Sequence, residues 1–285
     1  MRSSVPMSRI CAAIAVAVGV AISGCSTAPS AIEPLIQVPL VLRSGMPTTT
    51  VSIGGTPLKL FVDLGGYSAI ALTEGELRQV AVRYLTESRR STNASGDIYE
   101  TRRFIAPEVS LGGVALGDLE GIEFVFPETA APPDRNGYVG FALLSRFLLI
   151  VDYPGGSLRL YASGSKDAMI RECGDKSFEI DVVNGVAQTI ADTDHGKLVF
   201  SWDTGSIRSV IRPSAVGVSV KAGVPAPGAP PHRMTKFVLG SRDFGPQSFL
   251  PIDYRGVAVD GVLGTDFFAS RVVCLDIGRG KGAVR

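Results

Sequence analysis

Two aspartates at matched places in the chain are the residues best suited to do chemistry. Asp63 lies in the run LKLFVDLGGYSAI at 58–70, and Asp203 lies 140 residues later (203 minus 63) in the run LVFSWDTGSIRSV at 198–210. A lone Asp-x-Gly is usually an ordinary turn, but duplication within matched flanks favours a shared role. Two carboxylates that share one proton can act on one water molecule as base and acid. The repeat therefore indicates a carboxylate pair.

A second block repeats in the same order. The run GYVG at 137–140 leads to FLLIVDY at 147–153, and GVLG at 261–264 leads to RVVCLDI at 271–277. Asp152 and Asp276 coincide in these runs, and each follows a strand beside a glycine-rich turn, so we interpret both as turn residues. Two blocks in one order predict two similar halves.

The composition indicates which elements position these residues. The 285 residues include 33 Gly and 18 Pro, and long stretches with helical periodicity of apolar residues are hard to find. Many short strands joined by turns are expected, which is an all-β architecture. The formal net charge is only +1, with no run of like charge, so nothing suggests nucleic acid as a partner.

These blocks together resemble the pepsin and retropepsin clan of aspartic proteases, here as a bacterial lipoprotein. The resemblance covers the organisation of residues 36–285 and implies two homologous β-barrel lobes, mainly β with short helices, with a cleft between them. It assigns residues 36–165 to the N-terminal lobe and 166–285 to the C-terminal lobe. Because both units stand in one chain, it implies a monomeric endopeptidase that acts on a peptide or protein substrate.

The resemblance also implies individual roles around Asp63 and Asp203. Gly65 and Gly205 let the backbone approach the carboxylates, because no Cβ stands in the way. Thr204 is expected to bond across to the opposite loop. Ser206 is expected to place its hydroxyl on the outer carboxylate oxygen. No cofactor and no metal are implied.

The first loop departs from the family pattern, because Leu64 and Gly66 stand where Thr or Ser is usual. The alternative function is therefore a pseudoprotease that binds peptides or an envelope partner in the same cleft. A flap hairpin is expected after the first Asp, with its tip at 95–97 and with Tyr99 near the substrate.

The N-terminus predicts export and lipidation. Arg2 and Arg9 precede an apolar stretch, 10–22, that is too short to span a membrane. The run ISGC at 22–25 resembles the bacterial lipobox, so 1–24 are interpreted as a signal peptide, Cys25 as the lipidated residue and 25–35 as the lipidated cysteine and tether. Ser26 favours outer-membrane sorting, facing the periplasm. The alternative is an ordinary signal peptide with an incidental cysteine.

The remaining cysteines and the histidines add little to the functional prediction. Cys173 and Cys274 would stand in an oxidising compartment, and the sequence leaves open whether they pair. His195 and His232 are the only histidines, and no His-Glu-x-x-His, Gly-x-Ser-x-Gly or glycine-rich phosphate loop is present. A zinc hydrolase, a serine hydrolase and a nucleotide enzyme are therefore not favoured.

Overall fold

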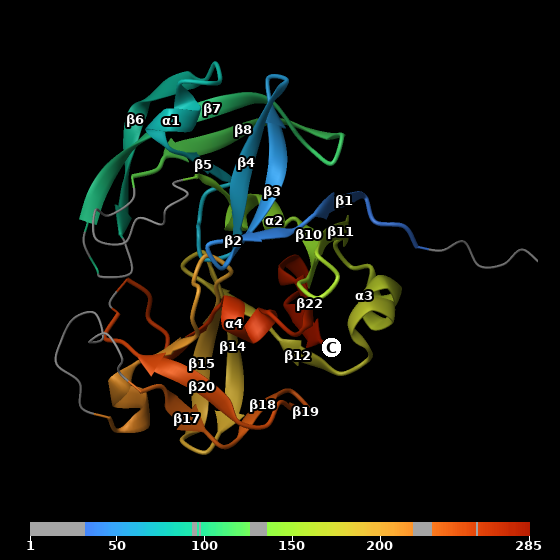
Figure 1. Ribbon diagram of the computed structural model, residues 1–285, viewed down its shortest axis with the longest axis vertical. Helices are drawn as coiled ribbons and strands as arrows, with labels where there is room; N and C mark the ends of the chain where they lie inside the picture. Colours follow the sequence, from blue (N-terminus) through green and yellow to red (C-terminus); the bar gives the residue numbers. More distant parts are fainter. Residues whose placement is uncertain (1–31, 93–95, 97, 126–135, 219–229, 255) are drawn as a thin grey trace, which may run out of the picture. The chain divides into compact units, whose positions relative to one another are not determined.

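The structure, a computed structural model, describes residues 32–92, 96, 98–125, 136–218, 230–254 and 256–285. The predicted signal peptide, the lipobox, Cys25 and the start of the tether lie outside the described residues. Residues 32–285 form one compact unit (Figure 1). Among the helices of the described residues, none is both long and apolar enough to cross a membrane.

Short strands dominate this unit, which confirms the all-β prediction. In chain order they are β1 Ile36–Pro39, β2 Val41–Arg43, β3 Met46–Ile53, β4 Thr56–Asp63, β5 Ile70–Leu72, β6 Arg83–Thr92, β7 Ile98–Leu111, β8 Val114–Glu123, β9 Tyr138–Gly140, β10 Phe147–Asp152, β11 Ser157–Ala162, β12 Ser177–Glu179, β13 Asp181–Val183, β14 Val186–Thr193, β15 Gly196–Trp202, β16 Val210–Ile211, β17 His232–Met234, β18 Phe237–Leu239, β19 Arg242–Asp243, β20 Gln247–Pro251, β21 Gly261–Leu263, β22 Val272–Asp276 and β23 Lys281–Val284. The helices are α1 Glu74–Leu77, α2 Phe141–Leu144, α3 Lys166–Cys173 and α4 Thr265–Phe268, with short 3-10 turns η1 Pro213–Val216 and η2 Ile277–Arg279.

The first half of the unit forms an eight-stranded sheet in the order β2-β3-β4-β9-β5-β8-β7-β6. Strand β4 runs parallel to β9, and the pairing places Asp63 opposite Gly140. Strands β6 and β7 form a long antiparallel hairpin at the place predicted for the flap. Of the predicted flap tip, Gly96 is described, whereas Ser95 and Asp97 lie outside the described residues.

The second half repeats this arrangement in a nine-stranded sheet that contains β17-β20-β16-β21-β15-β14-β18-β19, with β13 beside β14. Strand β15 runs parallel to β21, with Ser201 opposite Val262. The equivalent pair in the first half is Phe61 opposite Tyr138. The two parallel strand pairs therefore have the same register, which matches the sequence repeat. The predicted two-lobed fold is confirmed.

The two halves share a third sheet. Its order is β1-β11-β10-β22-β23-β12, so three strands come from each half. The two closing strands, β10 and β22, pair antiparallel at its centre, with Ile150 opposite Cys274. The closing strands of the two copies of the second sequence block are thus direct neighbours, and one continuous sheet contains strands from both halves.

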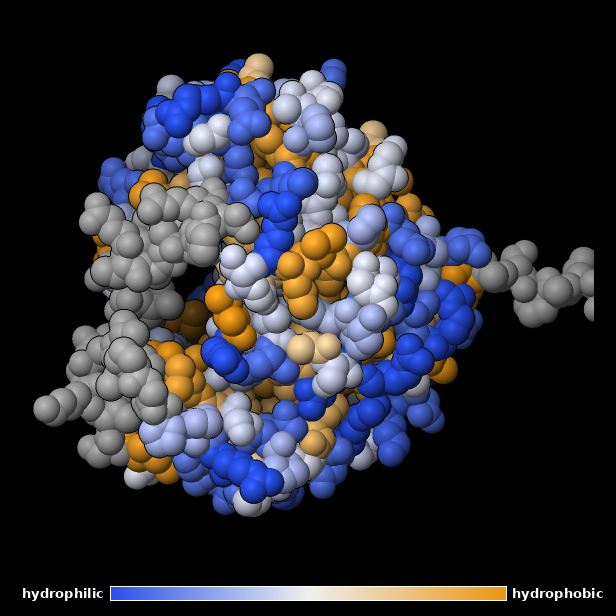
Figure 2. All heavy atoms as spheres, viewed as in Figure 1, coloured by the Kyte–Doolittle hydropathy of each residue, from blue (hydrophilic) through white to orange (hydrophobic). Residues whose placement is uncertain are grey.

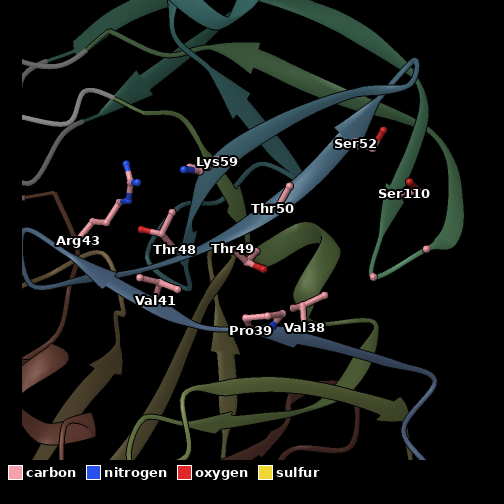
Figure 3. A pocket seen from close by; sticks show the side chains of 12 residues that line it. Val38, Pro39, Val41, Arg43, Thr48, Thr49, Thr50, Ser52, Lys59 and Ser110 are labelled. Carbon is pink, nitrogen blue, oxygen red and sulfur yellow. The ribbon is translucent and has the colours of Figure 1, made fainter.

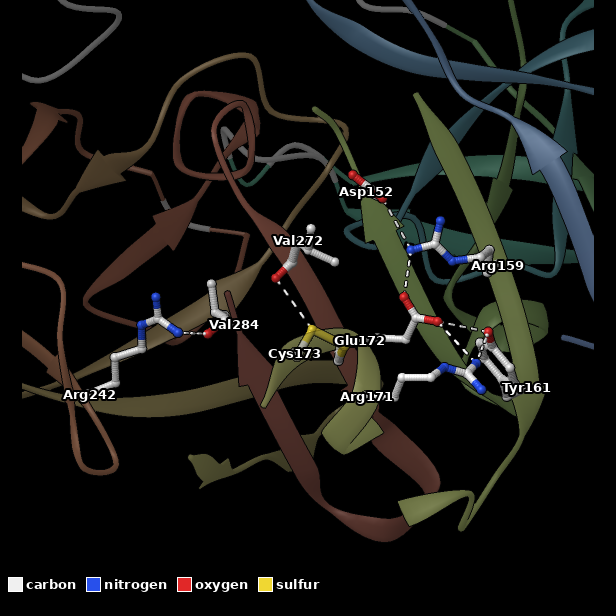
Figure 4. Close-up of a disulfide and its surroundings, with 10 residues drawn as sticks. Asp152, Arg159, Tyr161, Arg171, Glu172, Cys173, Arg242, Val272 and Val284 are labelled. Atoms are coloured by element: carbon white, nitrogen blue, oxygen red, sulfur yellow. Dashed lines mark hydrogen bonds and ion pairs between the residues drawn. A yellow bond between two sulfur atoms is a disulfide. The ribbon is translucent and has the colours of Figure 1, made fainter. Parts of the chain in front are cut away.

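Cys173 and Cys274 form a disulfide with a Cα–Cα distance of 6.2 Å, which settles the pairing that the sequence left open. The bond joins α3 to the central strand β22 of the shared sheet (Figure 4). Beside it, Arg159 donates to Glu172 at 2.8 Å and to Asp152 at 3.1 Å. Helix α3 is therefore held to the shared sheet by a covalent bond and by an ion-pair network.

Asp152 and Asp276 each end a strand next to a turn, as predicted, but their carboxylates bind different partners. Asp152 accepts the Gly155 N–H at 2.7 Å in its own turn. Asp276 is buried and accepts the Ser163 hydroxyl at 2.7 Å and the Gly164 N–H at 2.6 Å. Because the antiparallel pairing of β10 and β22 brings Asp276 beside the end of β11, its carboxylate binds the other half of the chain.

Aromatic packing fixes the strand that leads to Asp203. Trp202 has no exposed surface and stacks on Phe178, with ring centroids 5.4 Å apart and planes 8° apart. The rings of Phe267 and Phe268 in α4 approach Trp202 edge-on, each at 5.9 Å. Buried aromatic pairs contribute about 0.5–1.5 kcal/mol each beyond their area. The end of β15 is thus a rigid platform for the aspartate that follows it.

Candidate active site

Asp63 and Asp203 end equivalent strands, and each carboxylate is held by the backbone of its own loop. Oδ1 of Asp63 accepts the N–H of Gly65 at 2.8 Å and of Gly66 at 3.0 Å. Oδ1 of Asp203 accepts the N–H of Gly205 at 2.9 Å and of Ser206 at 3.1 Å. Charge-assisted bonds of this kind fix the rotamer of a carboxylate. The two predicted aspartates are therefore presented in the same way by both halves.

The structure brings these two carboxyl groups together, close enough for each to shift the pKa of the other. Burial raises the pKa of Asp63, although backbone N–H donors and the Asp203 hydrogen bond oppose that rise. Burial, and then the neighbouring Asp63 carboxylate, raise the pKa of Asp203 to about 8. Two adjacent carboxyls cannot both ionise easily, so the pair keeps one proton near neutrality. That proton is shared by the pair, because the pKa of each carboxyl is raised above its ordinary value.

Gly205 lies where its predicted role requires, and it also touches the opposite half. A Cβ on Gly205 would stand 2.5 Å from Oδ1 and 2.6 Å from Cγ of Asp63. Real Cβ contacts are essentially never this close. The loop that carries one aspartate is therefore pressed against the other aspartate, which keeps the two carboxyls adjacent.

Thr204 crosses to the opposite loop. Its hydroxyl accepts the Leu64 N–H at 3.0 Å and donates to the Val62 carbonyl at 2.6 Å. Thr204 has no exposed surface, and Leu64 is 1% exposed within the hydrophobic core. A leucine side chain carries no donor, so it cannot return the bond. The connection between the loops is consequently one-sided.

The predicted bond from the Ser206 hydroxyl to the Asp203 carboxylate is wrong. That hydroxyl donates to the Arg208 carbonyl at 2.7 Å, and only the Ser206 N–H reaches Asp203. A serine in a turn readily bonds to backbone two residues further on, which is the geometry adopted here. Ser206 supports the site through its backbone.

Gly66 departs from the family pattern because a tyrosine occupies the space. A Cβ on Gly66 would lie 2.4 Å from Cε2 and 2.7 Å from Cζ of Tyr138. In the second half, Ser206 and Val262 take the equivalent positions, so a larger loop residue is matched by a smaller strand residue. This exchange between the two halves was not recognised from the sequence, although both blocks display it.

Tyr99 lies half-buried on β7, as the flap assignment requires. Burial and the nearby Tyr67 raise the pKa of Tyr99. Tyr138 is buried, and Asp63, Tyr67 and Tyr99 all lie close enough to raise its pKa further. The guanidinium of Arg89 lies 4.1 Å from the centre of the Tyr67 ring. Tyr138 therefore lies near Asp63 on one side and near Tyr67 and Tyr99 on another.

Glu76 is a buried supporting residue that the sequence analysis missed. Its two carboxylate oxygens accept the Gly137 N–H at 3.0 and 2.9 Å. Oε2 also accepts the Thr73 N–H at 2.9 Å, which makes a capping box at α1. The Thr-x-x-Glu spacing at 73–76 is the signal that could have revealed it. Glu76 fixes the start of β9, and hence Tyr138.

An apolar cavity of about 210 Å³ adjoins Asp203. Its lining includes Gly65 from the first half, and otherwise comes from the second half: Val186, Ser201, Trp202, Asp203, Ser206, Val210, Ile252, Tyr254, Val257 and Val262. The space-filling view shows a hollow at the left of the molecule, with apolar residues, in orange, at its wall (Figure 2). A cavity of this size and character accommodates one apolar side chain beside the carboxyl pair.

Other cavities lie apart from the aspartates. One of about 560 Å³ lies along β2 and β3 and is lined by Arg43, Lys59 and the threonines at 48–50, among others (Figure 3). It shares no residue with the aspartate pair. Within the described ranges, no three or more histidine, cysteine, aspartate or glutamate side chains gather as a metal-binding group.

Comparison with known proteins supports the fold alone. No protein-family profile and no curated protein matches the sequence. The chain is similar to the crystal structure of basic 7S globulin from soybean, with 9% sequence identity and a TM-score of 0.57, over 87% of this chain and 94% of that chain. That structure has a pepsin-like fold with two lobes. The class that the fold defines is therefore the pepsin-like, two-lobed β proteins.

Proposed function

We propose that this protein is an aspartic endopeptidase that hydrolyses peptide bonds with a water molecule held between Asp63 and Asp203. The observation that carries the proposal is the mirrored pair of carboxyls, each fixed by two backbone N–H groups and together retaining one proton. Such a pair supplies the base and the acid that amide hydrolysis without a metal needs.

In this mechanism, ionised Asp63 takes a proton from the water as its oxygen bonds to the peptide carbonyl carbon. Protonated Asp203 gives its proton to the carbonyl oxygen, which leaves a neutral gem-diol. Asp203 then recovers a proton from one diol hydroxyl, and Asp63 passes its proton to the nitrogen as the C–N bond breaks. The pair ends with the same single proton that it began with. The apolar cavity beside Asp203 favours a substrate with an apolar side chain next to the scissile bond.

We further propose that the enzyme is a monomer anchored in the bacterial envelope through a lipid on Cys25, facing the periplasm. The lipobox-like run at 22–25 and the short tether support this assignment. The disulfide between Cys173 and Cys274 agrees with an oxidising compartment.

The deciding experiment is cleavage of a diverse peptide library by the purified protein between pH 3 and 8. We expect cleavage next to apolar residues, inhibition by a transition-state mimic such as pepstatin, and complete loss in Asp203→Asn. Cleavage that persists in Asp203→Asn would assign the activity to another site or to a contaminant.

The second candidate function is peptide binding without cleavage, and the one-sided loop connection favours it. Because Leu64 offers no hydroxyl, the carboxyls are held less firmly, and a misplacement of about one ångström can cost on the order of a hundredfold in rate. Leu64→Thr adds the missing hydroxyl and should raise turnover while peptide affinity changes little. Peptide binding without cleavage by either the wild type or Leu64→Thr would establish the binding function.

A further inference from the structure

Outside the aspartate pair, the two histidines of the chain meet. His195 lies in the turn between β14 and β15, and His232 begins β17, 37 residues later. Their Nε2 atoms are 2.9 Å apart, and their ring planes are tilted by 53°. The His195 side chain is 29% exposed. Solvent and small ions can therefore reach the pair.

The backbone around both histidines is braced before any ligand arrives. The Thr193 hydroxyl accepts the His195 N–H at 3.0 Å and donates to the Gly196 carbonyl at 2.8 Å. Oδ2 of Asp194 accepts the Thr235 N–H at 2.8 Å and the Thr235 hydroxyl at 2.7 Å. Because Thr235 follows β17, these bonds join the two segments that carry the imidazoles. A prearranged pair loses little freedom on binding an ion.

We propose that His195 and His232 form a two-histidine chelate for a divalent transition cation, Cu²⁺ foremost and then Ni²⁺, with water completing the coordination. Metal–imidazole bonds are about 2.0–2.1 Å long, so two such nitrogens are about 2.9 Å apart at a right angle and about 3.4 Å apart at a tetrahedral angle. The observed Nε2–Nε2 distance of 2.9 Å matches the right angle. Tetragonal nitrogen and oxygen coordination is typical of Cu²⁺ and Ni²⁺.

Asp194 supplies the charge that such a site needs. Its Oδ1 lies 3.9 Å from Nε2 of His195. Its other oxygen, Oδ2, accepts the N–H and the hydroxyl of Thr235, which holds the carboxylate in place. From this position the carboxylate orients and polarises a water molecule bound to the cation, in addition to the two nitrogen ligands. The nearby Lys236 ammonium is paired with Asp192 at 2.7 Å, so its charge is offset.

Metal binding requires a lone pair on both Nε2 atoms. Without metal, one ring donates its Nε2–H to the other, whose proton sits on Nδ1. When the cation binds, the donor ring moves its proton from Nε2 to Nδ1, so both rings stay neutral and no net proton is released.

The test is titration of the full-length, untagged protein in detergent micelles with Cu²⁺ and then Ni²⁺. We expect one Cu²⁺ per chain by calorimetry, coupling to two nitrogens in the electron paramagnetic resonance spectrum, and a higher thermal midpoint. His195→Gln and His232→Gln should each remove the two-nitrogen signal. Asp194→Asn should weaken binding by about tenfold or more. Lys197→Gln, an exposed change two residues further on in β15, is the matched control and should bind like the wild type.

Two results would overturn the proposal. Binding that persists in the double variant His195→Gln/His232→Gln would place the ion elsewhere. No binding by the wild type at millimolar Cu²⁺ would leave the pair as an N–H···N hydrogen bond. If a variant does not fold, paramagnetic broadening of both imidazole ¹⁵N signals in the wild type replaces it. None of these readouts depends on peptidase activity.

Discussion

A Cβ on Gly65 would stand 2.5 Å from both Cγ and Oδ1 of Asp203, so the backbone of the first loop lies directly against the carboxylate of the second. The mirror contact joins Gly205 to Asp63. From the sequence, each glycine was predicted to let the backbone approach the aspartate of its own loop. In the structure each glycine also lies against the carboxylate of the opposite loop. They set the separation between the two halves of the site.

Gly65→Ala should therefore disable the site without unfolding the protein. The added methyl group must push the Asp203 carboxylate aside, and an ångström of misplacement costs on the order of a hundredfold in kcat/KM. Gly75→Ala is the matched control, because the nearest atom to its added Cβ is the Thr73 hydroxyl oxygen at 3.9 Å. Peptide cleavage and thermal unfolding are measured for both variants. Full activity in Gly65→Ala would contradict the proposed pairing.

Thr204→Val should reduce both stability and activity. The change keeps the shape of the side chain but leaves the buried Leu64 N–H and the Val62 carbonyl without their hydroxyl partner. Unsatisfied buried groups cost about 1–3 kcal/mol each, so for these two groups the free energy of unfolding should fall by roughly 2–6 kcal/mol. Thr204→Ser keeps the hydroxyl and should preserve most of both properties. Equal behaviour of the Val and Ser variants in urea unfolding and in cleavage assays would contradict the role of the Thr204 hydroxyl in connecting the two loops.

Activity should fall as the pH rises through the pKa of Asp203. That pKa is raised to about 8, and the acid that protonates the carbonyl oxygen is lost above it. On the acid side, activity should fall as Asp63 takes up a proton. The measurement is kcat/KM against pH for one peptide. A rate that keeps increasing beyond pH 8 would indicate a different chemistry.

The same raised pKa predicts how stability depends on pH. The folded protein holds the Asp203 proton more tightly than the unfolded chain, where the ordinary value is 3.8. This contribution to the free energy of unfolding is complete below about pH 4 and is lost as the pH rises toward 8. Asp203→Asn removes it, so the variant should gain stability relative to the wild type at pH 8. Urea unfolding at pH 5 and pH 8 tests this.

The Tyr138 ring fills the space that a side chain at position 66 would need, so a double variant should show compensation. Gly66→Ser should destabilise the fold by about 1–3 kcal/mol, because the buried tyrosine ring occupies the space. In the Tyr138→Val background the same change should cost much less, since Ser206 and Val262 already coexist in the second half. The coupling is measured by a double-mutant cycle. Additive effects would show that the two positions do not share this space.

Cys25→Ser tests the membrane anchor. If Cys25 is lipidated, the wild type should partition into detergent and the variant into the aqueous phase, because the acyl chains carry the membrane affinity. Phase partition of both proteins expressed in a Gram-negative host is the measurement. A wild type and a variant that partition alike would leave an ordinary signal peptide as the explanation.

The sequence predicted the aspartates because repetition carries long-range information. The repeat aligns Asp63 with Asp203 and residues 137–140 with 261–264. These are the parallel strand pairs β4–β9 and β15–β21, which have the same register in the structure. Thr204 could be placed because its partner lies in the aligned loop. The two-lobed fold followed from the same alignment.

What the sequence did not reveal depends on contacts outside the repeat. His195 and His232 stand 37 residues apart with no motif spacing. They meet because β18, which follows β17, pairs with the end of β14 next to the β14–β15 turn. Asp276 looked like its counterpart Asp152, yet it bonds across the shared sheet. The Ser206 hydroxyl was assigned by analogy, whereas the local turn geometry decides its partner.

The shared sheet has a consequence for biosynthesis. During synthesis, β10 emerges more than a hundred residues ahead of β22, its partner along one edge. Until β22 arrives, that edge presents unpaired N–H and C=O groups, which can recruit another strand. Such non-local pairing slows folding because the intervening loop must close first. Nascent chains that do not yet contain β22 are consequently the species most prone to aggregate.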